Sequence, residues 1–484
     1  MEAAAAALGV SVPVLRFVVC FALTLPCSYL WRFVMGANNR HAYSALTGAV
    51  LSYYSFGVTS NLHFAVPICV SYLSMVLYRR RCGVITFFAA FAFLIFCHVI
   101  YMSGDAWKNG EIDSTGALMV LTLKVVSAAM NYQDGSLSEE GLRSAQQKYR
   151  LTKLPSFVAY VGYCLCCGTH LAGPVFELKD YIDWTEDKGL WDPKQQRPPA
   201  SPYGAAFSSF IKALFCMGMF VFLTPRVPLS KYSDPSYYEW SFLQRVGYQM
   251  LSGFTTRWKY YFIWSLAESS VILSGFGFSG WNGDAPKWDR ACNVNILEVE
   301  LASSAAQLPI HWNIHVSTWL RHFRPVCNFN PQYFEKGAIL DEIFLDVYER
   351  LVQKGKKPGF LQLLVTQVVS AVWHGLYAGY LLFFINSALF IAASKVIYRY
   401  QRAVPESNVI LTKVLQVVNG VFSSFVLNTT SIGFMVLGLR ETLAAYSSIY
   451  YSATIASLVL TVFGAVVKPP RPASTGQFKP KKVE

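Results

Sequence analysis

Long apolar runs recur along the whole chain, and they constrain its fold more than any other feature. The first run, at about 9–34, is long enough to cross a bilayer and has no clear small-residue cleavage site after it. We therefore predict an all-α polytopic membrane protein with about eleven transmembrane helices, some of them re-entrant or broken. The further predicted spans are 43–57, 62–78, 83–101, 116–131, 156–175, 205–224, 244–278 (interrupted), 296–320, 360–398 (two helices), 409–437 and 444–467.

Composition supports a surface that is mostly covered by lipid. Of the 484 residues, 54% are hydrophobic and only 14% are charged, whereas soluble domains carry about 25% charged residues. The net charge of +13 does not indicate a nucleic-acid partner, because the basic residues lie between apolar runs, as at 79–81, or in the tail at 468–482. Basic residues beside spans are typical of cytoplasmic loops and can attract anionic lipids or an anionic cosubstrate.

The positive loops also predict an orientation. Arg32, Arg40 and the arginines at 79–81 flank early spans, and placing them in the cytoplasm puts the N-terminus in the lumen. An odd number of crossings then puts the C-terminus in the cytosol. The last residues, 481–484 (KKVE), resemble the dilysine retrieval signal of endoplasmic-reticulum membrane proteins. We therefore expect a multi-pass protein of that membrane.

Motifs of several other protein classes are missing. The 11 cysteines show no metal spacing, and the cluster at 164–167 (CLCC) is typical of small packing residues in a helix. The chain has no Walker motif and no dinucleotide fingerprint. We expect neither a metal nor a bound cofactor.

One histidine lies deep in an apolar run, at the end of residues 368–375 (VVSAVWHG). Ionisable groups inside spans are costly and often functional, and a neutral imidazole can act as a base if a partner fixes its tautomer. The residues alone leave two interpretations of His374, a hydrogen-bonded structural histidine and a catalytic base. Trp373 before it and Gly375 after it suit a packed wall and a close backbone approach.

A second polar constellation occupies residues 311–321 (HWNIHVSTWLR). Asn313 carries both a donor and an acceptor, so it can hold a substrate or a histidine in a dry site. His311 and His315 have the i, i+4 spacing of a metal pair, but no glutamate lies between them and the sequence offers no third ligand. The pattern therefore favours a neutral polar site over a metal site.

The segments WNIHVSTWLR and SAVWHG together resemble the paired signatures of the membrane-bound O-acyltransferase superfamily. Residues 168–176 (GTHLAGPVF), 258–265 (WKYYFIWS) and 277–281 (GFSGW) are also similar to motifs of that family. The resemblance extends over about 9–467 and is closest to the plant-type lysophosphatidylcholine acyltransferases. The Phe-Tyr-x-Asp-Trp-Trp-Asn motif of the sterol and diacylglycerol branches is absent.

This resemblance implies a fold, an activity and a site. The implied fold is a catalytic domain at 1–467, with its helices around an intramembrane reaction tunnel, followed by a basic cytosolic tail at 468–484. The implied activity transfers a fatty acyl group from acyl-CoA, as cosubstrate, to the free hydroxyl of lysophospholipids, chiefly lysophosphatidylcholine and also lysophosphatidylethanolamine, in phospholipid remodelling (the Lands cycle). The implied catalytic residues are His374 and Asn313, and no oligomeric state is implied.

The expected substrate contacts lie around these two residues. For Arg321 and the three lysines an alternative stays open, namely that they are ordinary positive residues of a cytosolic loop. The expected contacts are Trp312, Trp373, Gly173, Pro174, Arg321, Lys354, Lys356 and Lys357.

The sequence departs from the family pattern in one place. Residues 324–346 form an insertion of 23 residues, which stretches the separation of Asn313 and His374 to 61 positions. It is either a mispredicted gene segment or a real cytosolic loop. Loop-closure entropy rises by only about 0.6 kcal/mol per doubling of length, so the fold can tolerate it.

Two rival functions are an acyltransferase for another lipid acceptor and a non-enzymatic membrane transporter. A transporter predicts charge pairs at mid-membrane and internal symmetry, neither of which is clear in the sequence. Glu268 lies in an apolar run and suits either a structural hydrogen bond or a substrate contact. Lys259, among aromatic residues, suits either a CoA contact or snorkelling to the membrane surface.

Overall fold

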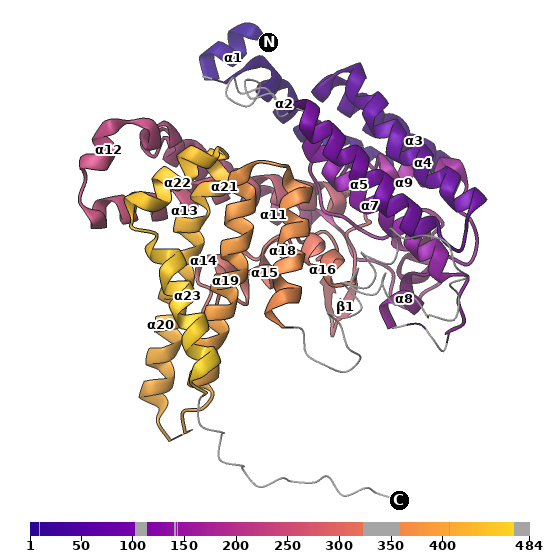
Figure 1. The fold of residues 1–484 in the computed structure, drawn as a ribbon. Helices are drawn as coiled ribbons and strands as arrows, with labels where there is room; N and C mark the ends of the chain where they lie inside the picture. The colour runs from indigo at the N-terminus through magenta and orange to yellow at the C-terminus, as the bar shows by residue number, and fades with distance from the viewer. Residues whose placement is uncertain are drawn as a thin grey trace, which may run out of the picture.

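The structure is a computed structural model that describes residues 1–8, 10–101, 114–139, 142, 144–322, 359–405 and 407–468. Within these residues the chain is helical apart from one short two-stranded sheet, as predicted. In Figure 1 the helices from α2 to α9 lie on the right and α19, α20 and α23 on the left, with α16 and α18 between the two groups.

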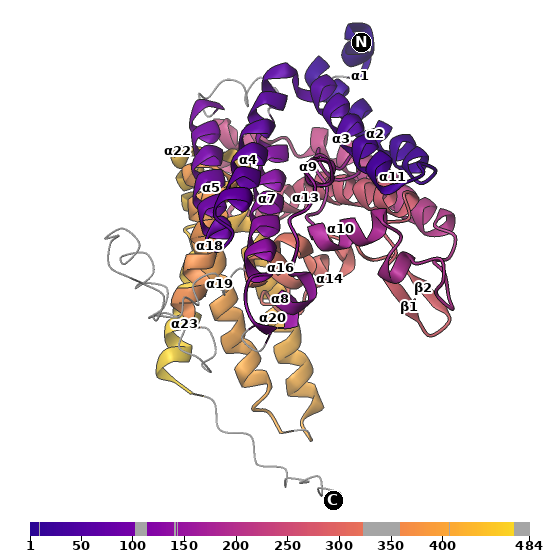
Figure 2. The same ribbon diagram turned by 90° about the vertical axis from the view of Figure 1, so that its right-hand side faces the viewer.

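Five helices of 20 residues form the N-terminal group, and each is about 30 Å long, the thickness of a hydrocarbon core. α7 is the least apolar of the spans yet the most buried, because it packs against both α4 and α5 (Figure 2). A helix surrounded by protein does not need an apolar surface. The five are α2 (Val12–Trp31), α3 (Ala37–Phe56), α4 (Val58–Leu77), α5 (Cys82–Tyr101) and α7 (Thr115–Asp134).

The longest helix is α13 (Phe242–Leu273), with 32 residues. It begins with a capping box in which the side chains of Ser241 and Gln244 bond each other's backbone, and it packs against α2, α20 and α11 (Tyr203–Leu223). The interruption predicted within 244–278 is therefore wrong up to Leu273, because the helix is continuous to that residue. Charged residues of α13, Arg257 and Glu268, are paired with neighbouring helices inside the bundle.

The C-terminal group is built around α19 (Ala378–Gln401), which contacts α18, α20 and α23. The expectation of two helices within 360–398 is confirmed. The other members are α18 (Phe360–His374), α20 (Val409–Thr430), α21 (Ile432–Val436), α22 (Leu439–Ser448) and α23 (Ser452–Val466).

Two predicted spans, 156–175 and 296–320, fold largely into short helices and turns. Within 156–175 only α9 (Phe157–Cys164) is an α-helix, and turns follow it. The predicted span at 296–320 consists of α14 (Ile296–Glu300), α15 (Leu308–His311) and α16 (Ile314–His322). Asn313 separates the last two with a φ of 48°, a left-handed conformation that no helix continues through.

The remaining elements are short and connect these groups. Trp281 pairs with Pro286 in the antiparallel sheet. The connecting elements are α1 (Glu2–Leu8), α8 (Ser144–Tyr149), α10 (Leu178–Thr185), η2 (Gly189–Trp191), η3 (Thr224–Arg226), η4 (Leu229–Ser233), α12 (Pro235–Glu239), β1 (Gly280–Asn282) and β2 (Ala285–Lys287).

The chain is a multi-pass membrane protein. The described residues contain seven helices that are long and apolar enough to cross a membrane, or eight if the pair α22 and α23, bent by 76°, is one broken span. The predicted number of about eleven crossings is not confirmed, because several predicted spans fold into shorter or less apolar helices.

Candidate active site

His374 is the last residue of α18, and its imidazole is held by its own helix. Its Nδ1 lies 2.7 Å from the carbonyl oxygen of Ser370, one turn earlier. A carbonyl only accepts, so Nδ1 carries the proton of a neutral ring and the lone pair lies on Nε2. The side chain is half-buried. The arrangement therefore presents Nε2 as an acceptor for a substrate proton.

Aromatic rings from three helices surround this imidazole. Trp373 and Phe384 have ring centroids 4.7 and 4.9 Å from that of His374. Phe434 of α21 and Tyr380 of α19 follow at 5.3 and 5.9 Å. Apolar walls limit the access of water, which protects a reactive acyl donor from hydrolysis.

The end of α18 is fixed from the N-terminal group. The indole Nε1 of Trp373 donates to the carbonyl of Met119 in α7 at 3.1 Å, and Nε2 of His98 in α5 lies 3.1 Å from the carbonyl of Trp373. Gly375 then ends the helix with a φ of 133°, a conformation that favours glycine.

Asn313 lies at the start of α16, where a neighbouring segment holds it. The side-chain Nδ2 of Asn293 donates to Oδ1 of Asn313 at 3.0 Å, while Oδ1 of Asn293 accepts from the backbone N–H of His315 at 3.0 Å. These bonds stabilise the left-handed backbone at Asn313. The amide Nδ2 of Asn313 is a donor that can be offered to a substrate.

Trp312, just before Asn313, packs against one face of α13. The rings of Tyr260, Tyr261 and Trp264 lie at centroid distances of 5.6, 5.7 and 4.9 Å from it. Edge-to-face contacts of this kind fix ring positions. The backbone at Asn313 is therefore positioned by Asn293 on one side and by α13 on the other.

One face of α7 holds both halves of the candidate site. Trp319 of α16 donates through Nε1 to Oγ of Ser127 at 3.0 Å and to the carbonyl of Leu123 at 3.3 Å, and Trp373 of α18 bonds Met119. Residues 119, 123 and 127 are four positions apart and so share one face, with about 6 Å of helix between successive partners. The helices of Asn313 and His374 thus dock on adjacent turns of α7.

The site combines a neutral base, an amide and an apolar wall. Within the described residues, each of the two polar side chains bonds a partner of its own, Asn293 for Asn313 and Ser370 for His374. Base and amide thus keep their orientation before any substrate arrives. This arrangement suits general-base chemistry on an acceptor hydroxyl in a site that excludes water.

Comparison with known proteins agrees with this chemistry. The sequence model of the membrane-bound O-acyltransferase family matches residues 99–323 and 345–435. The chain is 54% identical to Lysophospholipid acyltransferase 1 of Arabidopsis thaliana over 487 residues that cover all of both chains. The chain belongs to the membrane-bound O-acyltransferase family. The predicted resemblance is confirmed.

Other relatives share nearly the full length. Lysophospholipid acyltransferase 2 of Arabidopsis thaliana is 54% identical and is covered over 98% of both chains. The human Membrane-bound glycerophospholipid O-acyltransferase 1 is 28% identical over 98% of this chain and 92% of its own length. Membership of this family makes the chain an acyltransferase.

The Gly-Pro motif of the acyltransferase is buried. A Cβ added at Gly173 would lie 2.4 Å from the Cα of Thr169, so only glycine fits there. Lys124 of α7 donates to the carbonyls of Tyr163 and Cys164 at 2.5 and 3.2 Å, which caps the end of α9 ahead of this motif. Gly173 and Pro174 shape the backbone, and their predicted contact with substrate stays a prediction.

Of the predicted cationic contacts, only Arg321 lies within the described residues. Arg321 belongs to the last turn of α16. Lys354, Lys356, Lys357 and the insertion at 324–346 lie outside the described residues. The family match leaves out residues 324–344. The predicted domain division and the role of these cations stay predictions.

Glu268 and Lys259 have partners that suit structural roles. Oε2 of Glu268 accepts from Nζ of Lys212 at 2.6 Å and from Oγ of Ser209 at 3.1 Å, which joins α13 to α11. Nζ of Lys259 lies 5.0 Å from the ring centroid of Tyr260. The structural alternative for Glu268 is therefore the better supported.

The sequence reasoning missed Asn293. Its only signal is the motif at 292–295 (CNVN), which places two amides after a polar loop. The side-chain Nδ2 of Asn295 lies 3.1 Å from Nδ1 of His311. Both amides thus cross to the segment that carries Asn313, which the sequence alone does not specify.

Proposed function

We propose that this acyltransferase moves a fatty acyl group from acyl-CoA to the free hydroxyl of 1-acyl-lysophospholipids. The proposed main acceptor is lysophosphatidylcholine, and lysophosphatidylethanolamine is a second one. The protein would thus be an acyl-CoA:lysophospholipid O-acyltransferase of the remodelling cycle. The names of the two Arabidopsis relatives, each 54% identical, support this acceptor class.

The single observation that carries the mechanism is the bond from Nδ1 of His374 to the carbonyl of Ser370. It leaves Nε2 free to take the proton of the acceptor hydroxyl as the oxygen attacks the thioester carbonyl. The new C–O ester bond forms, the C–S bond breaks, and the proton passes from Nε2 to the departing CoA thiolate. Asn313 donates through Nδ2 to a substrate oxygen, and no acyl-enzyme is formed.

The proposed reaction takes place inside the membrane of the endoplasmic reticulum. The proposed substrate contacts near the two catalytic residues are Trp312 and Trp373, whose rings line the segments that carry those residues. CoA, with its phosphates, reaches the site from the cytosol, where we also place Arg321, the three lysines at 354, 356 and 357 and the C-terminal tail. Charge complementarity of this kind favours an anionic cosubstrate.

Microsomes of acyltransferase-deficient yeast expressing the full chain test the proposal. Incorporation of labelled oleoyl-CoA into lysophosphatidylcholine is expected in the intact chain. His374→Ala is expected to lower the rate by about 10²–10⁴-fold, the usual contribution of a general base.

His63→Ala is the matched control. His63 is a half-buried histidine of α4 that packs against Phe93 and makes none of the contacts described for the candidate site, and its loss is expected to change the rate less than about twofold. Equal activity of the wild type and His374→Ala would overturn the catalytic role of His374. No incorporation into any of several lysophospholipids by well-expressed wild type would overturn the acceptor class.

A further inference from the structure

Residues 293–313 form a loop whose two ends are bonded together, here called the 293–313 loop. Asn293 bonds Asn313 at 3.0 Å, and Val294 forms an antiparallel bridge with Trp312. The backbone N–H of Asn295 donates to the carbonyl of His311 at 2.9 Å. The position of Asn313 therefore depends on how the body of this loop is held.

The far part of the loop is bonded to α19. Oγ of Ser394 lies 2.8 Å from Oγ of Ser304 and accepts from the backbone N–H of Ala305 at 2.9 Å. Ser394 and Ala305 are fully buried. The loop thus enters the helix bundle and returns, with its tip fixed in the interior.

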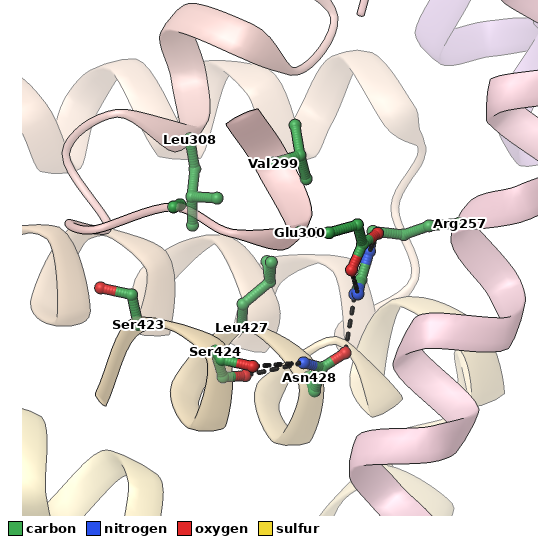
Figure 3. A pocket seen from close by; sticks show the side chains of 9 residues that line it. Arg257, Val299, Glu300, Leu308, Ser423, Ser424, Leu427 and Asn428 are labelled. Carbon is green, nitrogen blue, oxygen red and sulfur yellow. Dashed lines mark hydrogen bonds and ion pairs between the residues drawn. The ribbon is translucent and has the colours of Figure 1, made fainter. Parts of the chain in front are cut away.

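Between tip and ends, an ion pair ties the loop to α13 and α20. Nε and Nη2 of Arg257 bond the two carboxylate oxygens of Glu300 at 2.7 and 2.6 Å, and Nη1 donates to Oδ1 of Asn428 at 2.7 Å. Figure 3 shows Glu300 and Asn428 converging on the guanidinium beside a small pocket. The two charged side chains are only 10% and 16% exposed.

Stability alone does not explain this ion pair. Charges inside a membrane protein are costly, and replacing a buried ion pair with apolar residues is often neutral or stabilising. A bidentate pair does, however, fix relative positions to within a narrow range of geometry. Arg257 and Glu300 therefore fix the position of the loop relative to α13 more than they add to the stability of the fold.

Tyr261 links the ion pair to the candidate active site. Its hydroxyl donates to Oε1 of Glu300 at 2.5 Å, and its ring meets that of Trp312 edge to face at a centroid distance of 5.7 Å. Arg257 and Tyr261 are four residues apart, so they lie on one face of α13. The contacts run without a gap from Arg257 through Glu300 and Tyr261 to Trp312, which precedes Asn313.

We propose that this network positions Asn313 for acyl transfer, with Tyr261 as the link that acts through Trp312. The inference rests on the proposed function, since it names residues that act on the same site without touching the substrate. Tyr261 and the ion pair are positioning residues. Their loss is expected to slow the chemical step of folded enzyme rather than weaken substrate binding.

Tyr261→Phe tests the link, because it removes the hydroxyl and keeps the ring against Trp312. In purified enzyme normalised to its folded fraction, kcat is expected to fall about tenfold, which corresponds to one lost hydrogen bond to a charged group. KM for oleoyl-CoA and for lysophosphatidylcholine is expected to stay within about twofold, because positioning residues act on the transition state.

Tyr232→Phe is the matched control. Tyr232 is also buried, and its hydroxyl donates to Oγ of Ser252 at 2.9 Å in a separate cluster near α12. It is expected to lower thermal stability as much as Tyr261→Phe does while leaving kcat unchanged. A second variant, Arg257→Gln with Glu300→Gln, removes both charges without leaving one unpaired, and its kcat is expected to fall at least as far.

Hydrogen–deuterium exchange provides a readout that does not depend on activity. Faster exchange within 308–316 is expected in Tyr261→Phe and not in Tyr232→Phe. A kcat equal to that of the wild type in folded Tyr261→Phe and in the double variant would overturn the inference, as would unchanged exchange. If the wild type itself transfers no acyl group but exchange rises in Tyr261→Phe, the proposed function fails while the tie between Tyr261 and the loop stands.

Discussion

The orientation of the His374 imidazole depends on the last turn of α18. Its Nδ1 bonds the carbonyl of Ser370, so the tautomer is correct only while that turn stays helical. Gly375 ends the helix directly after the histidine with a φ of 133°. The orientation of the proposed base is thus set by one carbonyl before the ring and one glycine after it.

Gly375→Ala is expected to strain this turn. A residue with a Cβ adopts that φ only at a cost of about 1–3 kcal/mol, whereas the new Cβ itself would make only an ordinary contact of 3.5 Å with Tyr380. Acyltransferase activity per folded enzyme should fall about tenfold or more. Gly204→Ala in α11, where a Cβ meets open space at an ordinary φ, is the control. Equal effects of the two variants would contradict this account.

Glu177 predicts a pH dependence of stability outside the spans. Burial raises the pKa of Glu177 to about 7, although Asn131 donates to its carboxylate at 2.6 Å. A raised folded pKa means that the stability contributed by the protonated form is fully present below the unfolded pKa and is lost as the pH rises through 7. The wild-type melting temperature in detergent should therefore fall as the pH rises from 4.5 to about 7 and then level off.

Glu177→Gln should remove much of that fall, because glutamine keeps the bond from Asn131 and does not ionise. The expected change in melting temperature is about 2–4 °C per kcal/mol of stability. Glu186→Gln, at a carboxylate paired with Lys188 at 2.5 Å, should leave the fall in place. An unchanged pH slope in Glu177→Gln would show that other groups cause it.

At the scale of elements, α7 is the helix that brings the two halves of the site together. Its partners for the site are the carbonyls of Met119 and Leu123 and the hydroxyl of Ser127. Backbone carbonyls leave no mark in a sequence, so the apolar run at 116–131 predicted a span and nothing of this role. His374 and Asn313, in contrast, were singled out from the sequence because family motifs surround them, and their catalytic role stays a prediction.

Hydropathy also mispredicted elements whose polar residues pair in the interior. An interruption was expected within 244–278, yet α13 is continuous to Leu273, and its charged residues Arg257 and Glu268 have partners, Glu300 and Lys212, at 2.6 Å. The apolar run at 296–320 suggested a span, yet it folds back as the 293–313 loop. Long apolar helices were found from the sequence, whereas pairing between distant polar residues was not.

Trp319→Phe tests the docking of α16 on α7. It removes the donor and leaves the Ser127 hydroxyl buried without it, which costs about 1–3 kcal/mol. Ser127→Ala added to Trp319→Phe removes both partners and should recover part of that loss. Thermal unfolding in detergent measures both variants. Ser127→Ala alone is measured as well. If the losses of stability in the two single variants add up to the loss in the double variant, the bond does not couple the two residues.

At the scale of the whole molecule, distant segments of the chain share one site. Asn313 and His374 are 61 positions apart, yet α16 and α18 dock on adjacent turns of α7. The N-terminal group supplies α7 and the C-terminal group supplies Phe384 and Phe434 around the histidine.

This arrangement predicts that the acyltransferase tolerates the loss of residues 324–346. The deletion leaves 14 of the 37 residues between His322 and Phe360, and 14 residues can extend about 46 Å, farther than the roughly 30 Å of a hydrocarbon core. A shorter loop also costs slightly less closure entropy. Oleoyl transfer to lysophosphatidylcholine by microsomes should be equal to or above that of the intact chain.

The comparison variant keeps the chain length and replaces Lys354, Lys356 and Lys357, which we propose as CoA contacts, with Ala, and it should raise KM for oleoyl-CoA. Activity only after removal of 324–346 would mean that the insertion blocks a site that is otherwise complete. Loss of activity together with loss of folded protein on that deletion would contradict the prediction.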